Sequence, residues 1–351
     1  MTRDPPHAAL RVEAAEADRD DQLLAAAQAV APGWHTAPAA VVTPIPGGIT
    51  NLLYQLRAPG RPTVLVRIYG ARTELVIDRP AELRLLGRLS RAGFAPPLHG
   101  TFDNGRVEGF LEGFRALQPH ELGRPELVPG IAQRLAELHR FAPPSPQVQL
   151  WQTLRGWLDT ARGLHFAGER AERLAALDLD GQARLLDHLE RRVRDRAAAP
   201  AGPGQARALR PVLAHNDLLA GNVLYHPDAD ELRFIDYEYG ATAYAAFDVA
   251  NHLCEYAGFD SDFARHFPDA AARAAFVRAY LAAEGAPPPE EEVRDFCAEV
   301  EELVIVDHLW WGCWAVVQAA FSPIAFDFLD YARLRREGCQ RHRQELGVLP
   351  D

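Results

Sequence analysis

The stretch from His215 to Asp236 places Asp217, Asn222 and Asp236 at a spacing that suits one kind of chemistry. It opens with His-x-Asp-x-x-x-x-Asn, and Asp236 follows Asn222 by fourteen residues at the end of an apolar segment. This layout is typical of a phosphoryl-transfer loop, in which an Asp lies beside a substrate hydroxyl while an Asn and a second Asp bind Mg²⁺. We therefore expect Asp217 to be the catalytic base and Asn222 and Asp236 to be the metal ligands.

The residues between these groups predict the local structure that brings them together. Residues 222–225 and 232–235 alternate like short strands, and residues 227–230, with the sequence Pro-Asp-Ala-Asp, form a turn signal. A hairpin of this length returns Asp236 to the neighbourhood of Asn222.

A glycine-rich loop near residue 47 is a candidate for binding phosphate. Two adjacent glycines allow the backbone to approach phosphate oxygens, and neighbouring polar side chains add hydrogen-bond donors. The alternative is an ordinary turn between two strands. The loop residues that we assign to nucleotide binding are Gly47, Gly48, Thr50 and Asn51.

Arg67 lies inside the apolar strand segment 64–69. A lone Arg there usually faces solvent on an edge strand, but the loop before it and the Asp/Asn/Asp set after it favour phosphate binding. We assign Arg67 to catalysis as well as nucleotide binding, with Glu82 on the next predicted helix as its ion-pair partner. A solvated helix charge is the alternative for Glu82. The segment 108–113 should connect the two lobes and bind adenine through the backbone near Phe110, although it also fits a plain loop.

Two later segments could form a substrate site. Asp248, Asn251, His252 and Glu255 have the i, i+3, i+4, i+7 spacing of one helix face. We expect structural hydrogen bonds from Asp248 and His252, and a carboxylate for a substrate ammonium from Glu255.

Aromatic residues are concentrated further along the chain. Trp311 and Trp314 are three residues apart within a segment that holds three of the six Trp, and Phe326 and Tyr331 follow. Such a group suits an aromatic box around an organic cation. A packed core stripe is the alternative interpretation.

Composition limits the classes of function. The formal net charge of −11 argues against a nucleic-acid partner, and all 37 basic residues are Arg. The four Cys are scattered without metal-ligand spacing, as in proteins of a reducing cytoplasm. The first residues lack a signal-peptide pattern, and the longest apolar run, residues 309–321, is too short to insert into a membrane. We therefore expect a cytoplasmic protein.

The order of elements predicts the architecture. Residues 1–35 form a lead-in, residues 36–113 a strand-rich N-lobe that binds the nucleotide, and residues 114–351 a helical C-lobe with the catalytic loop. This is an α+β, two-lobed, protein-kinase-like fold. In the helical part we expect a helix over 127–140, two helices within 150–195 and a linker over 197–211.

The chain resembles the choline/ethanolamine kinase family, a branch of the aminoglycoside-phosphotransferase-like kinases, from about Thr43 to Arg343. The segments that carry the resemblance are GGITN, LVRIYG, HNDLLAGN, IDYEYG, FDVANHLCEYAG and WWGCWAVVQA. The resemblance implies ATP and Mg²⁺ as cofactors and a small amino alcohol as substrate, and it adds Tyr239 of IDYEYG to the substrate residues. A homodimer stays open.

Two details resemble the ethanolamine branch of the family: the segment VRIYGARTELVIDR, and Leu219 where choline kinases typically carry Gln. Ala243 departs from the family, which usually has Asn there in a loop. The main expectation is phosphorylation of ethanolamine to phosphoethanolamine. The alternatives are a choline kinase, a kinase of a larger amine such as an aminoglycoside, and a non-catalytic nucleotide-binding pseudokinase. A protein kinase is disfavoured because no Ala-Pro-Glu-like anchor follows Asp236.

Overall fold

The computed structural model describes residues 5–15, 17–46, 51–70, 73, 76–145, 147–322 and 324–348. Three residues assigned to nucleotide binding, Gly47, Gly48 and Thr50, lie outside these ranges. The chain divides into two compact units. Unit 1 comprises Met1–Phe114, His226–Ala229 and Ser322–Ile324, and unit 2 comprises Arg115–Tyr225, Asp230–Phe321 and Ala325–Asp351.

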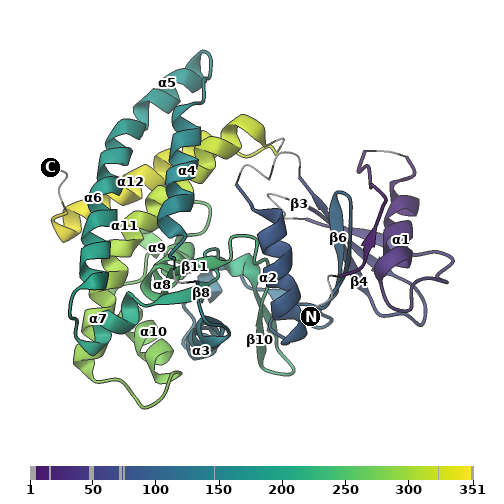
Figure 1. Cartoon of the computed structure of the whole chain (residues 1–351), viewed down its shortest axis with the longest axis horizontal. Coiled ribbons are helices and arrows are strands. Elements are labelled where there is room, and N and C mark those ends of the chain that lie inside the picture. Colours follow the sequence, from purple (N-terminus) through teal and green to yellow (C-terminus); the bar gives the residue numbers. More distant parts are fainter. Residues whose placement is uncertain are drawn as a thin grey trace. The chain divides into compact units, whose positions relative to one another are not determined.

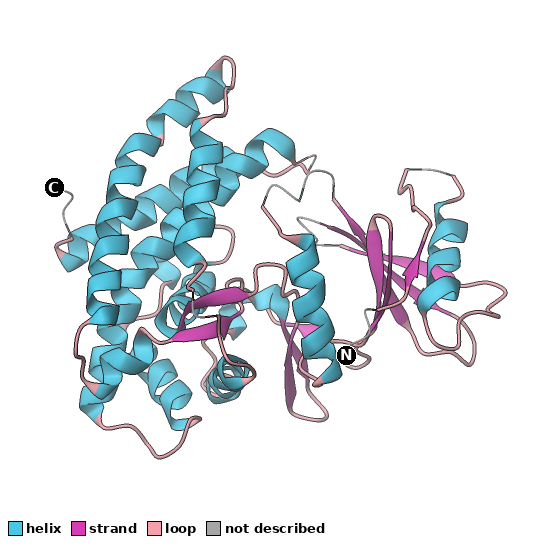
Figure 2. Cartoon of the chain, viewed as in Figure 1, coloured by secondary structure: helices cyan, strands magenta, loops and turns pink. Residues whose placement is uncertain are grey.

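Unit 1 is built on a six-stranded sheet with the strand order β1-β5-β6-β4-β3-β2 (Figure 2). All neighbouring strands are antiparallel except β1 and β5. The strands are β1 (His7–Ala8), β2 (Val41–Ile45), β3 (Asn51–Arg57), β4 (Val64–Tyr69), β5 (Leu98–Phe102) and β6 (Gly105–Gly109), and the helices are α1 (Arg19–Val30) and α2 (Arg79–Arg91).

Local sequence signals explain both helices of unit 1. Helix α2 begins at the predicted place, because the Asp78 side chain accepts a hydrogen bond from the Ala81 N–H (3.0 Å) and a Pro occupies the first turn. Helix α1, within the predicted lead-in, buries Leu23, Ala27 and other small apolar residues in the core of this unit. Trp34 is fully buried beside them, and its indole N–H donates to the Pro62 carbonyl.

Unit 2 is mostly helical, with a three-stranded sheet ordered β10-β9-β7 and a two-stranded sheet of β11 and β8. Its strands are β7 (Arg115–Ala116), β8 (Pro211–Ala214), β9 (Val223–His226), β10 (Glu231–Phe234) and β11 (Ala241–Tyr244). Its α-helices are α3 (Val128–Arg140), α4 (Leu150–Arg162), α5 (Glu169–Ala176), α6 (Leu179–Ala198), α7 (Pro203–Ala208), α8 (Ala245–Cys254), α9 (Phe263–His266), α10 (Ala270–Ala282), α11 (Glu290–Phe321) and α12 (Phe328–Leu346). Short 3₁₀ helices cover Pro119–Glu121, Ala220–Asn222 and Glu255–Ala257.

Helix α11 is the central element of unit 2. It packs against α12, α8, α7, α4 and α10, and Figure 1 shows it running alongside α12. By length and composition it could also cross a membrane, but 89% of its most apolar stretch is buried in the protein. Its apolar character is therefore accounted for by core packing.

Two expectations for the helical part were wrong. Three helices, rather than two, cover residues 150–195, because Gly168 and Asp178 adopt left-handed backbone angles that separate α4, α5 and α6. The predicted linker contains the short helix α7, in whose first turn Pro203 lies. The predicted helix over 127–140 is confirmed as α3.

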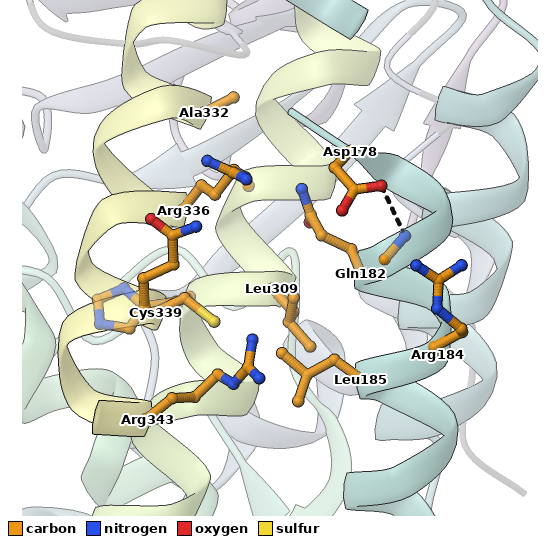
Figure 3. A pocket seen from close by; sticks show the side chains of 13 residues that line it. Asp178, Gln182, Arg184, Leu185, Leu309, Ala332, Arg336, Cys339 and Arg343 are labelled. Carbon is orange, nitrogen blue, oxygen red and sulfur yellow. Dashed lines mark hydrogen bonds between the residues drawn. The ribbon is translucent and has the colours of Figure 1, made fainter. Parts of the chain in front are cut away.

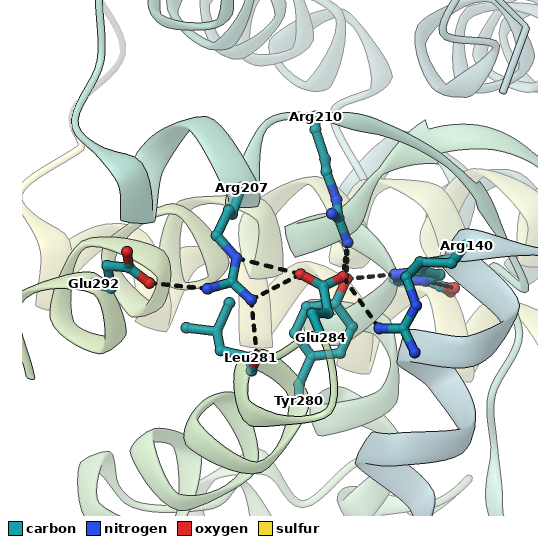
Figure 4. A network of polar contacts seen from close by, with 9 residues as sticks. Arg140, Arg207, Arg210, Tyr280, Leu281, Glu284 and Glu292 are labelled. Carbon is teal, nitrogen blue, oxygen red and sulfur yellow. Dashed lines mark hydrogen bonds and ion pairs between the residues drawn. The ribbon is translucent and has the colours of Figure 1, made fainter. Parts of the chain in front are cut away.

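A polar network around Glu284 fixes the end of α10 (Figure 4). The carboxylate accepts hydrogen bonds from Arg207 (2.8 Å) and from Arg210, and Arg140 approaches it to 4.0 Å. Because Arg140 ends α3 and Arg207 lies on α7, one buried carboxylate ties three helices together.

Candidate active site

The β9–β10 hairpin brings two predicted metal ligands together. The N–H of Ile235 donates to the carbonyl of Asn222 (3.0 Å), so Asp236 follows directly after a residue bonded to Asn222. The Ile235 carbonyl is 2.9 Å from Nε2 of His215, which joins the hairpin to the first residue of the catalytic loop. The hairpin prediction is confirmed.

Asp217 and Asn222 are in direct contact. The Asn222 side-chain amide donates to the Asp217 carbonyl (2.8 Å) and to its carboxylate (3.0 Å). Both residues are buried. Since Nδ2 is engaged, and no described residue donates to Oδ1 of Asn222 by a hydrogen bond, that oxygen is the part of the amide left for a metal ion.

A buried carboxylate clamps the backbone of the catalytic loop. Asp248 on α8 accepts hydrogen bonds from the N–H groups of His215 and Asn216, each at 2.7 Å. It also lies 2.9 Å from Nε2 of His139, whose other ring nitrogen is 2.8 Å from the Tyr280 hydroxyl. Although burial alone would raise the pKa of Asp248, these partners hold it below its ordinary value.

The next turn of α8 holds the backbone on the other side of Asp217. Asn251 accepts from the Leu218 N–H (2.9 Å) and donates to Asp307 on α11 (2.9 Å). Nδ1 of His252 is 2.9 Å from the Leu218 carbonyl. The expected structural hydrogen bonds of Asp248 and His252 are thus confirmed.

Two residues of the site have left-handed backbone angles. Asn216 has φ +63° and Asp236 has φ +64°. Asn and Asp tolerate this region better than other non-glycine residues because their side chains bond locally. The Asn216 side chain instead donates to the carbonyl of Tyr239 (2.9 Å), which lies 23 residues further along the chain.

Negative charge is concentrated around Asp217. Burial raises the pKa of its carboxyl well above the ordinary value, and the charges of Glu255, Asp236 and Glu238 raise it further. A set of crowded carboxylates with a free amide oxygen fits Mg²⁺, which prefers hard oxygen ligands and would offset the repulsion.

Glu255 follows the end of α8 and is also buried. Burial raises its pKa to about 7, Arg335 opposes this shift, and Asp307 adds to it. Oε1 of Glu255 is 3.8 Å from Arg335, which also forms an ion pair with Asp307. The carboxylate is therefore only partly neutralised by the protein.

The predicted aromatic residues form one continuous cluster. The Trp314 indole N–H donates to the Tyr239 hydroxyl (2.8 Å), and the Trp311 ring meets both Tyr239 and Trp314 edge to face at 5.5 and 5.4 Å. Tyr331 connects Trp314 to Phe326, with ring centroids at 6.5 and 5.8 Å. Burial raises the pKa of Tyr331, and the charges of Glu255 and Asp217 raise it further, so this one ring of the cluster lies within electrostatic reach of the two carboxylates.

Several residues of this site were missed from the sequence. Trp157 lies 5.9 Å from Tyr239, and Phe259 lies 5.8 Å from Phe326. Glu238 and Arg335 influence the two key carboxylates. Glu238 could have been found from its position two residues after Asp236, whereas the others come from distant segments and left no local signal.

The environment of Ala243 differs from the expected loop. Ala243 is fully buried in β11 and pairs with Val212 of β8. A strand residue in a closed core has no room for the loop hydrogen bond that an Asn would make.

Glu82, the predicted partner of Arg67, has two other arginines as hydrogen-bond partners. Arg67 on β4 is buried, and its cross-strand neighbour is Arg106 of β6. Glu82 accepts hydrogen bonds from Arg106 and from Arg79 (2.7 Å). These two arginines lower the pKa of Glu82 despite its burial. Glu82 is thus neutralised by guanidinium groups other than that of Arg67.

Other nucleotide-binding candidates are also held within unit 1. Arg79 donates to Oδ1 of Asn51 (3.1 Å) and to the Thr73 hydroxyl (2.9 Å), which ties the start of β3 to the start of α2. The Phe110 N–H donates to the Thr63 carbonyl (3.2 Å). The carbonyl of Phe110 is then the backbone group that could accept a hydrogen bond from a ligand.

Comparison with known proteins gives consistent results. The Choline/ethanolamine kinase family profile matches residues 42–338. A probable ethanolamine kinase of Arabidopsis thaliana is 34% identical over 83% of this chain and 76% of its own length. Probable choline kinase 2 of the same plant is 32% identical over 90% of both chains. Human ethanolamine kinase 1 is 33% identical over 82% of this chain and 64% of its own.

Solved structures agree with the sequence relatives. An ethanolamine kinase of Plasmodium vivax superposes with a TM-score of 0.75 at 26% identity, over 87% of this chain and 83% of that one. A choline kinase of Cryptosporidium parvum gives 0.74 at 24% identity, over 94% and 98%. The α+β, kinase-like fold is confirmed, and the chain belongs to the choline/ethanolamine kinase family.

Proposed function

We propose that this protein transfers the γ-phosphoryl group of ATP to the hydroxyl of ethanolamine, giving phosphoethanolamine and ADP. It is a phosphotransferase that acts on an alcohol, as its family membership requires. The observation that carries the proposal is the buried arrangement of Asp217 beside Asn222, with the carboxylates of Asp236 and Glu255 acting on it electrostatically.

Asp217 is proposed to orient the substrate hydroxyl and accept its proton. Its backbone is fixed on both sides, by Asp248 before it and by Asn251 and His252 after it. Such positioning is most of what phosphoryl transfer requires, because its transition state is loose and needs little covalent assistance.

Asn222 and Asp236 are proposed to hold Mg²⁺. The ion would neutralise negative charge on the transferring phosphates. The amide of Asn222 would have two roles, since its nitrogen donates to Asp217 and its oxygen would be available to hold the metal. In unit 1, Arg67 is proposed to neutralise phosphate charge, and Asn51 and Phe110 to contact the nucleotide. Gly47, Gly48 and Thr50 are proposed to join them.

The ammonium of the substrate is proposed to bind Glu255. A primary ammonium has three N–H donors and needs oxygen acceptors, whereas a quaternary ammonium has none and needs aromatic faces. An arriving cation favours the ionised form of Glu255, whose pKa is raised to about 7 by burial. Tyr239, Trp311, Trp314, Phe326 and Tyr331 are proposed to enclose the carbon atoms.

A choline kinase is the second candidate. The aromatic cluster around Trp311 and Trp314 is the observation in its favour, because the faces of aromatic rings suit a trimethylammonium group. The two relatives from Arabidopsis, at 34% and 32% identity, do not separate the substrates by themselves. Leu219, which lies where choline kinases typically carry Gln, favours ethanolamine.

The deciding experiment measures ADP release with Mg-ATP against ethanolamine, its N-methyl derivatives, choline and one aminoglycoside. A higher kcat/KM for ethanolamine supports the proposal. A higher value for choline keeps the mechanism but assigns selectivity to the aromatic residues. Nucleotide binding without amine-stimulated ADP release would instead indicate a pseudokinase. We further propose a cytoplasmic location, and sedimentation would decide between a monomer and a homodimer.

A further inference from the structure

A cavity in unit 2 lies among α6, α11 and α12 (Figure 3). Its volume is about 200 Å³. Its lining includes apolar side chains, among them Leu185 from α6, Leu309 from α11 and Ala332 from α12. None of the residues assigned above to catalysis, metal or substrate lines it, so the cavity is separate from the candidate active site.

Three arginines from two helices line this cavity: Arg184 on α6, and Arg336 and Arg343 on α12. Figure 3 shows the side chains of Arg336 and Arg343 extending from one helix and that of Arg184 from the other. The positive charges of Arg343 and Arg336 both act on the Cys339 thiol, which lines the same cavity. The cavity wall is therefore strongly cationic.

These guanidinium groups lack carboxylate partners within the part of the chain that the structure describes. With the Gln340 amide oriented so that both its oxygen and its nitrogen have suitable neighbours, the oxygen accepts a hydrogen bond from Arg336 (3.2 Å). Arg343 donates to the Val348 carbonyl (3.2 Å). Neighbouring arginines on α12 behave differently. Arg333 forms ion pairs with Asp330 and Glu337, and Arg341 pairs with Glu345.

A buried polar atom at the cavity also lacks a partner. His308, which is 1% exposed, lines the cavity, and its Nδ1 has no hydrogen-bond partner among the described residues. Its Nε2 is engaged with His342 (2.9 Å). Asp178 is the one carboxylate in the lining, and it is used as the α6 cap by accepting from the Gly181 N–H (3.0 Å).

We propose that this cavity is a binding site for a small phosphate-bearing anion, either inorganic phosphate or a phosphomonoester. Guanidinium groups match phosphate oxygens in geometry and form charge-assisted hydrogen bonds with them. The volume lies below the roughly 300–1,000 Å³ typical of sites for drug-sized ligands, which favours a small occupant. This site does not depend on the proposed substrate of the kinase.

The test is isothermal titration calorimetry of the full chain with inorganic phosphate, in EDTA and without nucleotide. The first variant carries Arg336→Glu and Arg343→Glu, and the matched control carries Arg333→Glu and Arg341→Glu on the same helix. We expect the first variant to lose about tenfold or more in affinity, since each lost charge-assisted hydrogen bond costs on this order. The control variant should bind like the wild type.

Equal affinity in the two double variants would overturn the proposal, as would the absence of phosphate binding by the wild type. Where Arg336→Glu and Arg343→Glu disturb the far-UV spectrum, the neutral changes Arg336→Gln and Arg343→Gln replace them. Titration with phenyl phosphate, a phosphomonoester that is not the product of the proposed reaction, then distinguishes the sources. Tighter binding than phosphate supports a phosphomonoester ligand, and equal binding supports inorganic phosphate.

Discussion

The Asp217 carboxylate must be ionised before it can accept a proton from the substrate, yet burial among other carboxylates favours its protonated form. Its raised pKa follows from burial first and from the charges of Glu255, Asp236 and Glu238 second. A bound cation reverses the second contribution. The basicity of Asp217 is therefore set by what binds near it as well as by the protein.

The change Asp217→Asn should lower kcat by about 10²–10⁴-fold, the range typical of losing a general base. The fold should be retained, because an Asn side-chain oxygen can still accept from the Asn222 amide. Steady-state kinetics and far-UV circular dichroism measure both outcomes. Asp228→Asn in the exposed hairpin turn is the control and should leave kcat unchanged. Turnover of Asp217→Asn within a few-fold of the wild type would refute the assignment.

Glu255 should leave a signature in the pH dependence of stability. Its pKa is about 7 in the folded chain, against an ordinary 4.5, so the folded state binds its proton more tightly than the unfolded state. The resulting stability is fully present below about pH 4.5 and is lost as the pH rises through about 7.

Glu255→Gln removes this titration, so its Tm should fall less between pH 5 and pH 8 than that of the wild type. Its KM for the amino alcohol should rise. Differential scanning fluorimetry and kinetics check the two effects, with the exposed Glu291→Gln as the control. Parallel Tm curves for Glu255→Gln and the wild type would contradict the raised pKa.

Trp311→Ala should raise the KM for the amino alcohol much more than the KM for ATP, since its ring contacts Tyr239 and Trp314 of the proposed substrate cluster. Trp310→Ala provides a matched control on the same helix. Trp310 packs on Trp157 (4.3 Å) and Phe247 (5.7 Å), so its loss should lower Tm without separating the two KM values. If Trp311→Ala changes the KM for the amino alcohol and the KM for ATP equally, Trp311 is only a core residue.

At the scale of elements, α8 determines where the catalytic loop lies. Asp248 alone accepts two backbone N–H groups of that loop and contacts His139 from α3. Because its pKa is lowered in the folded chain, this stabilisation is present above the ordinary Asp pKa and is lost as the pH falls through the folded value. The loop should therefore loosen in acid.

Asp248→Asn should lower the free energy of unfolding by about 1–3 kcal/mol, since it removes charge-assisted hydrogen bonds from buried donors. Turnover should fall as well, because Asp217 is anchored through the same loop. Urea unfolding measures the first effect. Asp269→Asn is the control, because Asp269 caps α10 and Asn caps a helix equally well. If Asp248→Asn unfolds at the same urea concentration as the wild type, Asp248 does not stabilise the catalytic loop.

The elements show how far the sequence alone could lead. The β9–β10 hairpin and α2 were predictable because turn and cap signals are local. The partner of Glu82 was not, since Arg106 reaches it through strand pairing that brings β6 beside β4. The two carboxylate partners of Arg335, which are Glu255 and Asp307, likewise depend on the packing of α12 and α8 against α11. Contacts across distant segments leave no pattern in a single sequence.

At the scale of the whole molecule, chemistry and folding should be separable by metal removal. The Asn222 carbonyl accepts from Ile235 and its side chain contacts Asp217, so the protein positions this proposed ligand by itself. EDTA should therefore abolish ADP release while shifting the Tm of the nucleotide-free protein little. Scanning fluorimetry and the ADP assay, with Mg²⁺ added back as the control, test this. Loss of the folded state in EDTA would show that the metal is structural.

The left-handed backbone angles at Asn216 and Asp236 restrict which sequences can carry this site. Side chains other than Gly, Asn and Asp are strained at such angles, whatever their chemistry. In a saturation mutagenesis library, most replacements at Asn216 should therefore fail for a reason of backbone geometry, although Asn216 takes no part in the proposed reaction. Glycine is the informative variant there, because it relieves the strain but loses the bond to the Tyr239 carbonyl. The set of substitutions accepted at position 216 would thus reflect the backbone conformation that the site requires. The set accepted at position 217 would reflect the chemical role of the side chain.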